Sequence, residues 1–336
     1  AIGSAGVDGT LAKSLRAIAD QARPIIVVVR VEEGDTDAET AANVIGTTLA
    51  DGKKTGTQAL LAAQAQHGVK PKIIGAPGLE TQAVTAALVV VAQKLRGFAY
   101  ARALGADVSA AVTYRANFGA RELMLLCPDF LAFDTAAEAN VTSYAAARAM
   151  GLRAYIDETV GPHKTLSNVA VNGVVGLTQD IHWDIEDQAS EAGILNQAQV
   201  TALVRTDAGY RFWGNRTTTE DELFAFESTV RVAQLLADTV VNGMLWALDK
   251  PLTPALAKDI VETINGFGRQ LKASGVLLGF NAWYSEANNS TASLQAGKLR
   301  IDYDHTVPPP LEDLGFNQRI TDSYLADFSS LVADAV

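Results

Sequence analysis

The chain has 336 residues, of which 48% are hydrophobic and 19% are charged, and a chain of this kind is long enough for two domains with hydrophobic cores. Its formal net charge of −11 argues against a nucleic-acid-binding protein, which usually carries a basic surface, and against docking on an anionic membrane. The longest apolar runs, such as AALVVVA, are well short of the roughly 18 residues that a membrane helix needs.

Helices and strands are predicted to alternate through the first 150 residues. Residues 10–22 have a helical pattern, and the β-branched run IIVVVRV at residues 25–31 is typical of a buried strand. After an acidic loop at residues 32–40, helices are predicted at 58–66, 81–96, 109–118 and 142–150, and strands at 72–76, 97–101 and 121–126. This alternation predicts an α/β domain with a mostly parallel, doubly wound sheet that is covered on both faces.

The pattern changes after Arg153. Residues 163–187 are rich in Asn and Gly and indicate extended segments and turns, and residues 195–205 predict a strand that ends before a turn at Gly209. Thr219 and Glu222 have the spacing of a capping box, so a long helix is expected to start there. Its apolar stripe would be formed by residues three or four apart, namely Leu223, Phe226, Val230, Ala233, Ala237, Val240 and Met244.

The last third predicts a second long helix and two further strands. Thr253 and Pro254 are typical of a helix start, and Gly275 of a helix end. Residues 276–284 and 298–306 predict strands, and the second alternates as a half-buried strand does. Pro308 to Pro310 interrupt the chain before a short strand at residues 316–321, and the last apolar positions form an amphipathic segment: Tyr324, Leu325, Phe328, Leu331 and Val332.

Motifs that carry enzyme chemistry are missing from the sequence. It has no phosphate-binding G-x-x-x-x-G-K-[ST] loop, no H-E-x-x-H and no G-x-S-x-G nucleophile elbow. Cys127 lies in the apolar run LMLLCP, which predicts a buried, inert thiol. His182 with Asp184, Glu186 and Asp187 could bind a hard cation, but a solvated acidic turn after a strand is the simpler explanation, which we prefer. We therefore predict no catalytic, cofactor-binding or metal-binding residue, and an α/β enzyme (hydrolase-like) with a C-terminal cap remains the competing class.

Five segments carry a resemblance to a known family. They are GNRT at 214–217 with YRFW before it, KLRGFAY at 94–100, RELMLLCPDFLAFDT at 121–135, HKTLSNVAVNGVVG at 163–176 and AGKLRIDYDHTVPPPLEDL at 296–314. With these segments the chain resembles the tail sheath proteins of contractile-tailed bacteriophages, in the branch of temperate enterobacterial phages and R-type pyocins, and the likeness runs from end to end.

The resemblance implies a structural subunit and no enzyme. Such subunits stack as hexameric rings around a tail tube, between a baseplate and a tail terminator, and contract to drive the tube through the bacterial envelope. They belong to the virion tail and are assembled in the host cytoplasm, without nucleic-acid or membrane partners. The resemblance further implies an outer, subtilisin-like α/β domain at residues 1–212 and an inner α+β domain at 213–336 with exchanged terminal arms, of which the N-terminal one would lie upstream of these residues.

Strand addition between subunits would tie neighbours together through backbone hydrogen bonds. With residues 308–315 as a linker, we expect the donated C-terminal arm to carry Phe316, Gln318, Ile320, Tyr324, Leu325 and Phe328. The receiving strand would present Leu299, Ile301 and Tyr303, although a hairpin within one chain is an alternative. The charged face of the 254–272 helix is expected to contact the tube, or else to be a solvated face, and comprises Lys258, Asp259, Glu262, Arg269 and Lys272.

Overall fold

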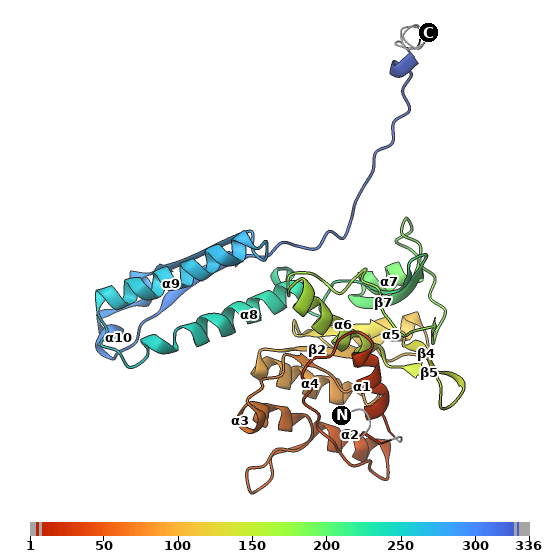
Figure 1. The fold of residues 1–336 in the computed structure, drawn as a ribbon, viewed down its shortest axis with the longest axis horizontal. Coiled ribbons are helices and arrows are strands. Elements are labelled where there is room, and N and C mark those ends of the chain that lie inside the picture. Colours follow the sequence, from red (N-terminus) through yellow and green to blue (C-terminus); the bar gives the residue numbers. More distant parts are fainter. Residues whose placement is uncertain (1–4, 7–8, 326–327, 329–336) are drawn as a thin grey trace.

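The computed structural model describes residues 5–6, 9–325 and 328 (Figure 1). Elements α1 to β8 form a body with a central sheet, and elements α8 to β10 form a projection that extends away from it. Residues 308–325 leave this framework as an extended C-terminal arm. None of the helices in the described residues combines the length and apolarity needed to cross a bilayer.

The helices of the body are α1 (Leu11–Ala19), α2 (Asp37–Ile45), α3 (Ala63–His67), α4 (Gln82–Leu95), α5 (Val108–Arg115), α6 (Ala145–Thr159) and α7 (Glu191–Gln197), with a 3₁₀ helix η2 (Gly56–Ala62). Its strands are β1 (Ile73–Ile74), β2 (Phe98–Arg102), β3 (Leu123–Cys127), β4 (Phe130–Asp134), β5 (Ala139–Ser143), β6 (Gly176–Leu177), β7 (Val200–Thr206) and β8 (Gly209–Trp213). A short 3₁₀ helix, η3 (Glu222–Phe224), lies between the body and the projection. The projection contains α8 (Glu227–Gly243), η4 (Leu245–Ala247), α9 (Pro254–Ala273), β9 (Gly279–Tyr284), η5 (Glu286–Asn288), α10 (Thr291–Gln295) and β10 (Ile301–Thr306), and η6 (Ser323–Leu325) lies in the arm.

The main sheet has five strands in the order β1-β2-β3-β7-β8. The first four are parallel, and β8 returns antiparallel to β7. The parallel strands are largely apolar because helices cover both of their faces. This arrangement confirms the predicted α/β class with a mostly parallel sheet.

The sheet separates two hydrophobic cores, and alternate side chains of each central strand point into one core or the other. Ala99 and Ala101 of β2 face the core that contains α4, α5 and α7. Phe98 and Tyr100 of the same strand face the core that contains α6. Gly151 allows α1 to pack closely on α6, since a Cβ there would lie 2.7 Å from the Ile18 carbonyl oxygen. Helix α1 therefore lies on the α6 face of the sheet, whereas Val44 of α2 belongs to the opposite core.

Three predictions in the body were wrong at the level of elements. Residues 25–31 form no strand, and the side chain of Ile25 is 81% exposed. The predicted helix at 142–150 begins at Ala145, because residues 139–143 pair with β4 in a hairpin that the prediction missed. The predicted strand at 195–205 begins at Val200; Leu195 belongs to α7, which Ser190 caps by accepting a hydrogen bond from the Gly193 N–H.

The organising helix also begins later than predicted. Thr219 does not cap α8; its hydroxyl accepts a hydrogen bond from the Asp221 N–H at 3.2 Å, and Asp221 in turn caps the short η3 helix. Helix α8 starts only at Glu227, so Leu223 lies outside it and is 79% exposed. Val230 does pack into the α6 core, whereas Val232 and Leu236 pack against α9 and β9 in the core of the projection.

Candidate assembly surfaces

The projection contains a two-stranded antiparallel sheet, β9 paired with β10. The outer edge of β9 is occupied at its centre, because the Asn265 side-chain amide of α9 donates to the Ala282 carbonyl and accepts from the Ala282 N–H, both at 2.8 Å. Ala282 therefore directs its backbone groups away from β10. Residues opposite each other in an antiparallel pair share this orientation, so Tyr303, the partner of Ala282, directs its own N–H and carbonyl away from β9.

The free edge of β10 coincides with the predicted receiving strand. Ile301 has the same orientation as Tyr303, two residues away. Arg300 has the opposite orientation, and both of its backbone groups bond to the buried Asn289 amide at 2.8 Å. Leu299 lies just before the strand and is half-buried. In the described part of the chain the outer edge of β10 has no partner strand.

The C-terminal arm is attached at two points and then extends freely. Val307 is buried in the core of the projection. Glu312 pairs with Arg216 at 2.7 Å and accepts from the Asn215 amide at 3.4 Å, so the arm is held against the GNRT segment. Beyond this point its large apolar side chains are mostly exposed, at 61% for Leu314, 84% for Phe316, 98% for Ile320, 69% for Leu325 and 61% for Phe328.

The predicted strand at residues 316–321 does not form within this chain. These residues, Gln318 among them, are exposed and have no secondary structure. A strand needs a neighbouring strand to bond its backbone, and none lies beside these residues in the described chain. The side chain of Tyr324, as well as Leu331 and Val332, lies outside the described residues.

The five predicted tube-facing side chains all lie exposed on α9. The Arg269 and Glu262 side chains approach each other at 3.8 Å while they are 69% and 75% exposed. The opposite side of the helix packs on the projection core through Phe267 and Leu271. The structure thus places this charged face away from the core.

A buried charged network, which the sequence analysis missed, attaches α8 to the body. The Glu227 carboxylate accepts from the Tyr100 hydroxyl at 2.6 Å and from Arg153 Nη1 at 3.2 Å, and all three side chains are fully buried. Burial and the neighbouring Glu227 charge raise the pKa of Tyr100 well above its usual value. Asp157 pairs with Arg153 at 3.0 Å and also with Arg231 of α8.

A second charged cluster holds the middle of α8. Asp238 pairs with Arg96 at 2.8 Å, with Lys70 at 3.5 Å and with Lys72. Burial opposes ionisation of Asp238, but hydrogen bonds from Lys72 and Arg96 outweigh it and lower the pKa of this carboxyl. Its partners come from before β1 and from the end of α4, so no local sequence pattern could have predicted the cluster.

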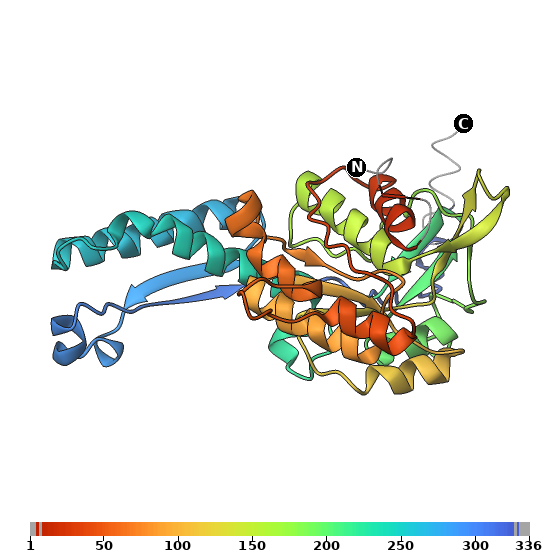
Figure 2. The ribbon, with the colours of Figure 1, turned by 90° about the horizontal axis from the view of Figure 1, so that it is seen from below.

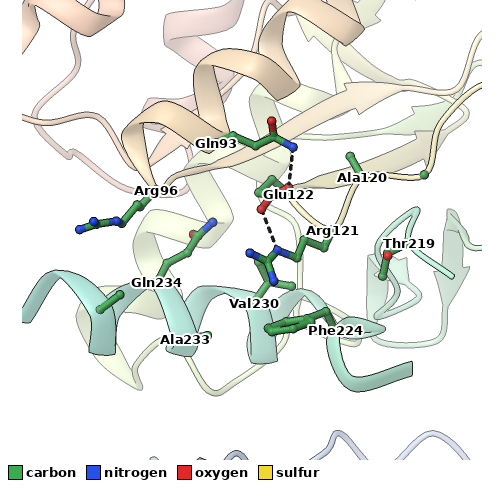
Figure 3. A pocket seen from close by; sticks show the side chains of 12 residues that line it. Gln93, Arg96, Ala120, Arg121, Glu122, Thr219, Phe224, Val230, Ala233 and Gln234 are labelled. Carbon is green, nitrogen blue, oxygen red and sulfur yellow. Dashed lines mark hydrogen bonds and ion pairs between the residues drawn. The ribbon is translucent and has the colours of Figure 1, made fainter. Parts of the chain in front are cut away.

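An open cavity of about 610 Å³ lies between these two attachments, where α8 crosses the end of α4 and residues 119–122 (Figure 3). Glu122 accepts from Gln93 at 3.3 Å and from Arg121 Nε at 2.9 Å. The Arg121 guanidinium lies 4.3 Å from the centre of the Phe224 ring. The three polar side chains thus satisfy one another within the body, and the contact between Arg121 and the Phe224 ring connects them to the segment before α8.

Another buried polar cluster lies at the carboxyl ends of the parallel strands. Asp129 pairs with Arg102 at 3.2 Å and accepts from the Ala145 N–H at 2.8 Å. Burial raises the pKa of Asp129 and raises that of Glu80 to about 7. Burial also raises the pKa of the Cys127 thiol to about 11, as expected for an inert thiol.

The acidic residues around His182 serve the local backbone. Asp184 accepts from the Glu186 N–H at 2.9 Å and Asp187 from the Ala189 N–H at 2.8 Å, as carboxylates in turns do. Among the residues that the structure describes, no group of three His, Cys, Asp or Glu side chains is arranged to bind a metal ion.

An unpaired strand edge together with an exposed apolar arm is typical of proteins that assemble by strand addition. Comparisons with known proteins identify the family. Residues 52–218 match the family described as the phage tail sheath protein central domain, and residues 219–321 match the phage tail sheath C-terminal domain. This chain belongs to the phage tail sheath protein family.

Individual relatives agree with this assignment. The chain is 51% identical to the tail sheath protein of Escherichia phage P2, over 99% of this chain and 85% of that protein. It is 44% identical to the major tail sheath protein of Serratia phage KSP20, over 98% of this chain and 85% of that protein. It is therefore a structural tail sheath protein and not an enzyme, and the competing hydrolase assignment is not supported.

Solved structures share the fold at low sequence identity. The anti-feeding prophage helical sheath in its contracted state superposes with a TM-score of 0.68 and 18% identity, over 95% of this chain and 83% of that one. A chain of the six-fold symmetrised anti-feeding prophage baseplate gives a TM-score of 0.71 and 17% identity, over 94% and 82%.

Proposed function

We propose that this protein polymerises as stacked hexameric rings around a tail tube and contracts to drive that tube through a bacterial envelope. Its place would be the virion tail, assembled in the host cytoplasm, with a baseplate and a terminator at the two ends of the sheath. The observation that carries this proposal is the unpaired outer edge of β10 together with an arm whose described large apolar side chains are mostly exposed. The similarity of the fold to subunits of a contracted helical sheath and of a six-fold symmetrised baseplate supports it.

Strand addition would join the two features. The arm of one subunit, with Phe316 and Ile320 on one side, would pair with the β10 edge of a neighbour at Leu299, Ile301 and Tyr303. Backbone hydrogen bonds would then hold the donated strand on the neighbouring subunit. Residues 313–315, which carry no secondary structure, would connect that strand to its own subunit. Such a link allows the bodies to change their relative orientation while the subunits remain joined.

The inner surface of the ring would be formed by the projection. We propose that residues 213–336 face the tube, that residues 1–212 lie outside, and that the charged face of α9 contacts the tube through Lys258, Asp259, Glu262, Arg269 and Lys272. Polar contacts of this kind are modest in strength, which suits a contact that must break when the sheath widens.

The finer assignment of the outer domain, a doubly wound subtilisin-like sheet, is also part of this proposal. Its support is that α4 and α6 cover opposite faces of a mostly parallel sheet. Superposition on a subtilisin-like domain tests it, and the assignment fails if strand order and crossovers do not correspond.

Truncation after Leu314 tests the arm. The truncated chain should fold, because residues 315–323, 325 and 328 are exposed in the described structure, but it should no longer form sheath cylinders in negative-stain microscopy. Cylinders of normal length from this truncation would refute the proposed arm exchange.

A matched pair of double variants makes the test more specific. In an added strand, Phe316 and Ile320 face one side while Asn317 and Thr321 face the other. F316S/I320S should abolish polymerisation, whereas N317S/T321S should leave cylinders intact. Equal polymerisation of the two variants would show that the apolar side of the arm is not what the neighbour binds.

Charge reversal tests the tube contact separately. The variant K258E/K272E should weaken co-sedimentation with preformed tail tubes more than it weakens sheath self-assembly. Unchanged tube binding would eliminate α9 as the tube-facing helix and leave its charges as a solvated surface.

A further inference from the structure

The segment between α1 and α2 has the composition of a core strand but lacks the partners of one. Residues 22–34 run without a turn or bend, and within them IIVVVRV occupies residues 25–31. In the described part of the chain, no backbone N–H or carbonyl of residues 25–31 bonds to another backbone group. The side chains of Ile25, Ile26 and Val28 are 81%, 39% and 41% exposed. An unpaired β-branched run of this kind invites pairing with another strand.

This segment lies at an edge of the sheet that is itself unpaired. Helix α1 packs on the α6 face, and α2 packs on the α4 face, so the chain between them must pass around the outside of β1 (Figure 2). Val31 reaches the α4 core. Strand β1 pairs only with β2 among the described strands, and its other edge faces the side on which the segment lies.

The handedness of crossovers shows which strand is missing. Connections between parallel strands of one sheet are almost always right-handed, so crossovers on opposite faces advance in opposite directions along the sheet. The connection from residues 25–31 through α2 to β1 lies on the α4 face, as does the connection β1–α4–β2, and both advance toward β3. Helix α1 lies on the other face. A parallel strand that precedes α1 must therefore lie on the inner side of residues 25–31, between them and β1.

We propose that a parallel strand preceding α1 in the complete tail sheath protein inserts between residues 25–31 and β1 and completes the sheet. We expect the sequence of this strand to be an apolar, β-branched run of about five residues, because helices cover both faces of the sheet at that position. The ten residues before α1, AIGSAGVDGT, include three glycines and do not have this composition. This chain covers 85% of the phage P2 protein, so 15% of that protein lies outside the match.

From β1 to β7 each later strand in the sequence lies further along the sheet in the same direction. With the inserted strand next to β1 and residues 25–31 outermost, the first two strands of the sheet would be added in the opposite direction. That reversal is what defines a doubly wound sheet. The inference rests on family membership and topology, and it does not depend on ring assembly or arm exchange.

Hydrogen exchange followed by mass spectrometry tests the proposal in three samples: this 336-residue stretch, the complete gene product kept monomeric at low concentration, and the assembled sheath. Amides of residues 25–31 should exchange quickly in the first sample and roughly 100-fold or more slowly in the second, because a strand in a closed ladder exchanges only on local opening. Protection that appears only after assembly would mean that a neighbouring copy supplies the strand. Protection in the 336-residue stretch, or in none of the samples, would overturn the proposal.

Proline substitutions provide an independent measurement on the complete protein. In a strand paired on one side, alternate N–H groups face the partner, and proline is tolerated where the N–H faces solvent. V28P and V29P, each compared with alanine at the same position, should therefore differ clearly in unfolding midpoint in the complete protein. Equal effects would contradict pairing of residues 25–31 on one side.

Discussion

The buried network at the start of α8 gives the sharpest quantitative prediction, made with the variant E227A. Glu227 is fully buried and bonds Tyr100 at 2.6 Å and Arg153 at 3.2 Å. Removing one member of a buried ion pair costs about 3–5 kcal/mol, because the remaining charge is left uncompensated. Asp157 still pairs with Arg153 at 3.0 Å, so we expect about 3 kcal/mol, at the low end of that range.

The ion pair between Arg216 and Glu312 provides the matched control. Its partners are 40% and 31% exposed, and exposed pairs contribute only about 0–1 kcal/mol. Urea unfolding of the unassembled chain, followed by circular dichroism, should therefore give a large loss of stability for E227A and a small one for E312A. A loss below about 1 kcal/mol for E227A, or equal losses for both variants, would show that the network does not hold α8 to the body.

Three other variants or treatments address separate features. N265A should lower stability by about 1–3 kcal/mol, because it leaves the buried N–H and carbonyl of Ala282 without partners; urea unfolding against N265D, which keeps an acceptor, measures this. Glu80 has a folded-state pKa of about 7, above its ordinary value of 4.5, so its contribution to stability is complete below about pH 4.5 and is lost as the pH rises through 7. Unfolding of the wild type relative to E80Q between pH 4 and 9 should show that loss, and parallel curves would contradict it. Iodoacetamide at pH 8 should label Cys127 far more slowly in the folded than in the urea-unfolded chain, because its thiol is buried and its pKa is about 11, and similar labelling rates would disprove the burial.

Local sequence signals predicted elements well where the hydrogen-bond partners lie close together in the sequence. Thr81 caps α4 by accepting from the Val84 N–H at 3.2 Å, and Thr253 caps α9 in the same way through Leu256. These caps involve residues three apart in sequence, so a short window contains both partners. The mostly parallel α/β character followed from the same alternation of elements.

Predictions failed where the partners lie far apart in sequence. The capping box at Thr219 competed with tertiary contacts: Thr218 is fully buried and bonds the backbone of Ala120 about a hundred residues away. The receiving edge on β10 could be proposed from alternation alone, but the outward orientation of the Ile301 and Tyr303 backbone groups is revealed by the contacts of Asn265 and Asn289, which no periodicity indicates. For residues 25–31 the residue types predicted a strand, but the described chain provides no strand beside them.

The extended arm has a consequence for subunits that have not yet found a neighbour. Exposed segments without secondary structure are preferred sites of proteolytic cleavage, and Arg319 lies within such a segment. A trypsin-like protease would separate Ile320 and everything after it from an otherwise intact body. Burial of the arm in an adjacent copy would protect the same peptide bonds. Rapid incorporation would then preserve the supply of usable subunits, whereas a delayed subunit would be clipped and lost to the polymer.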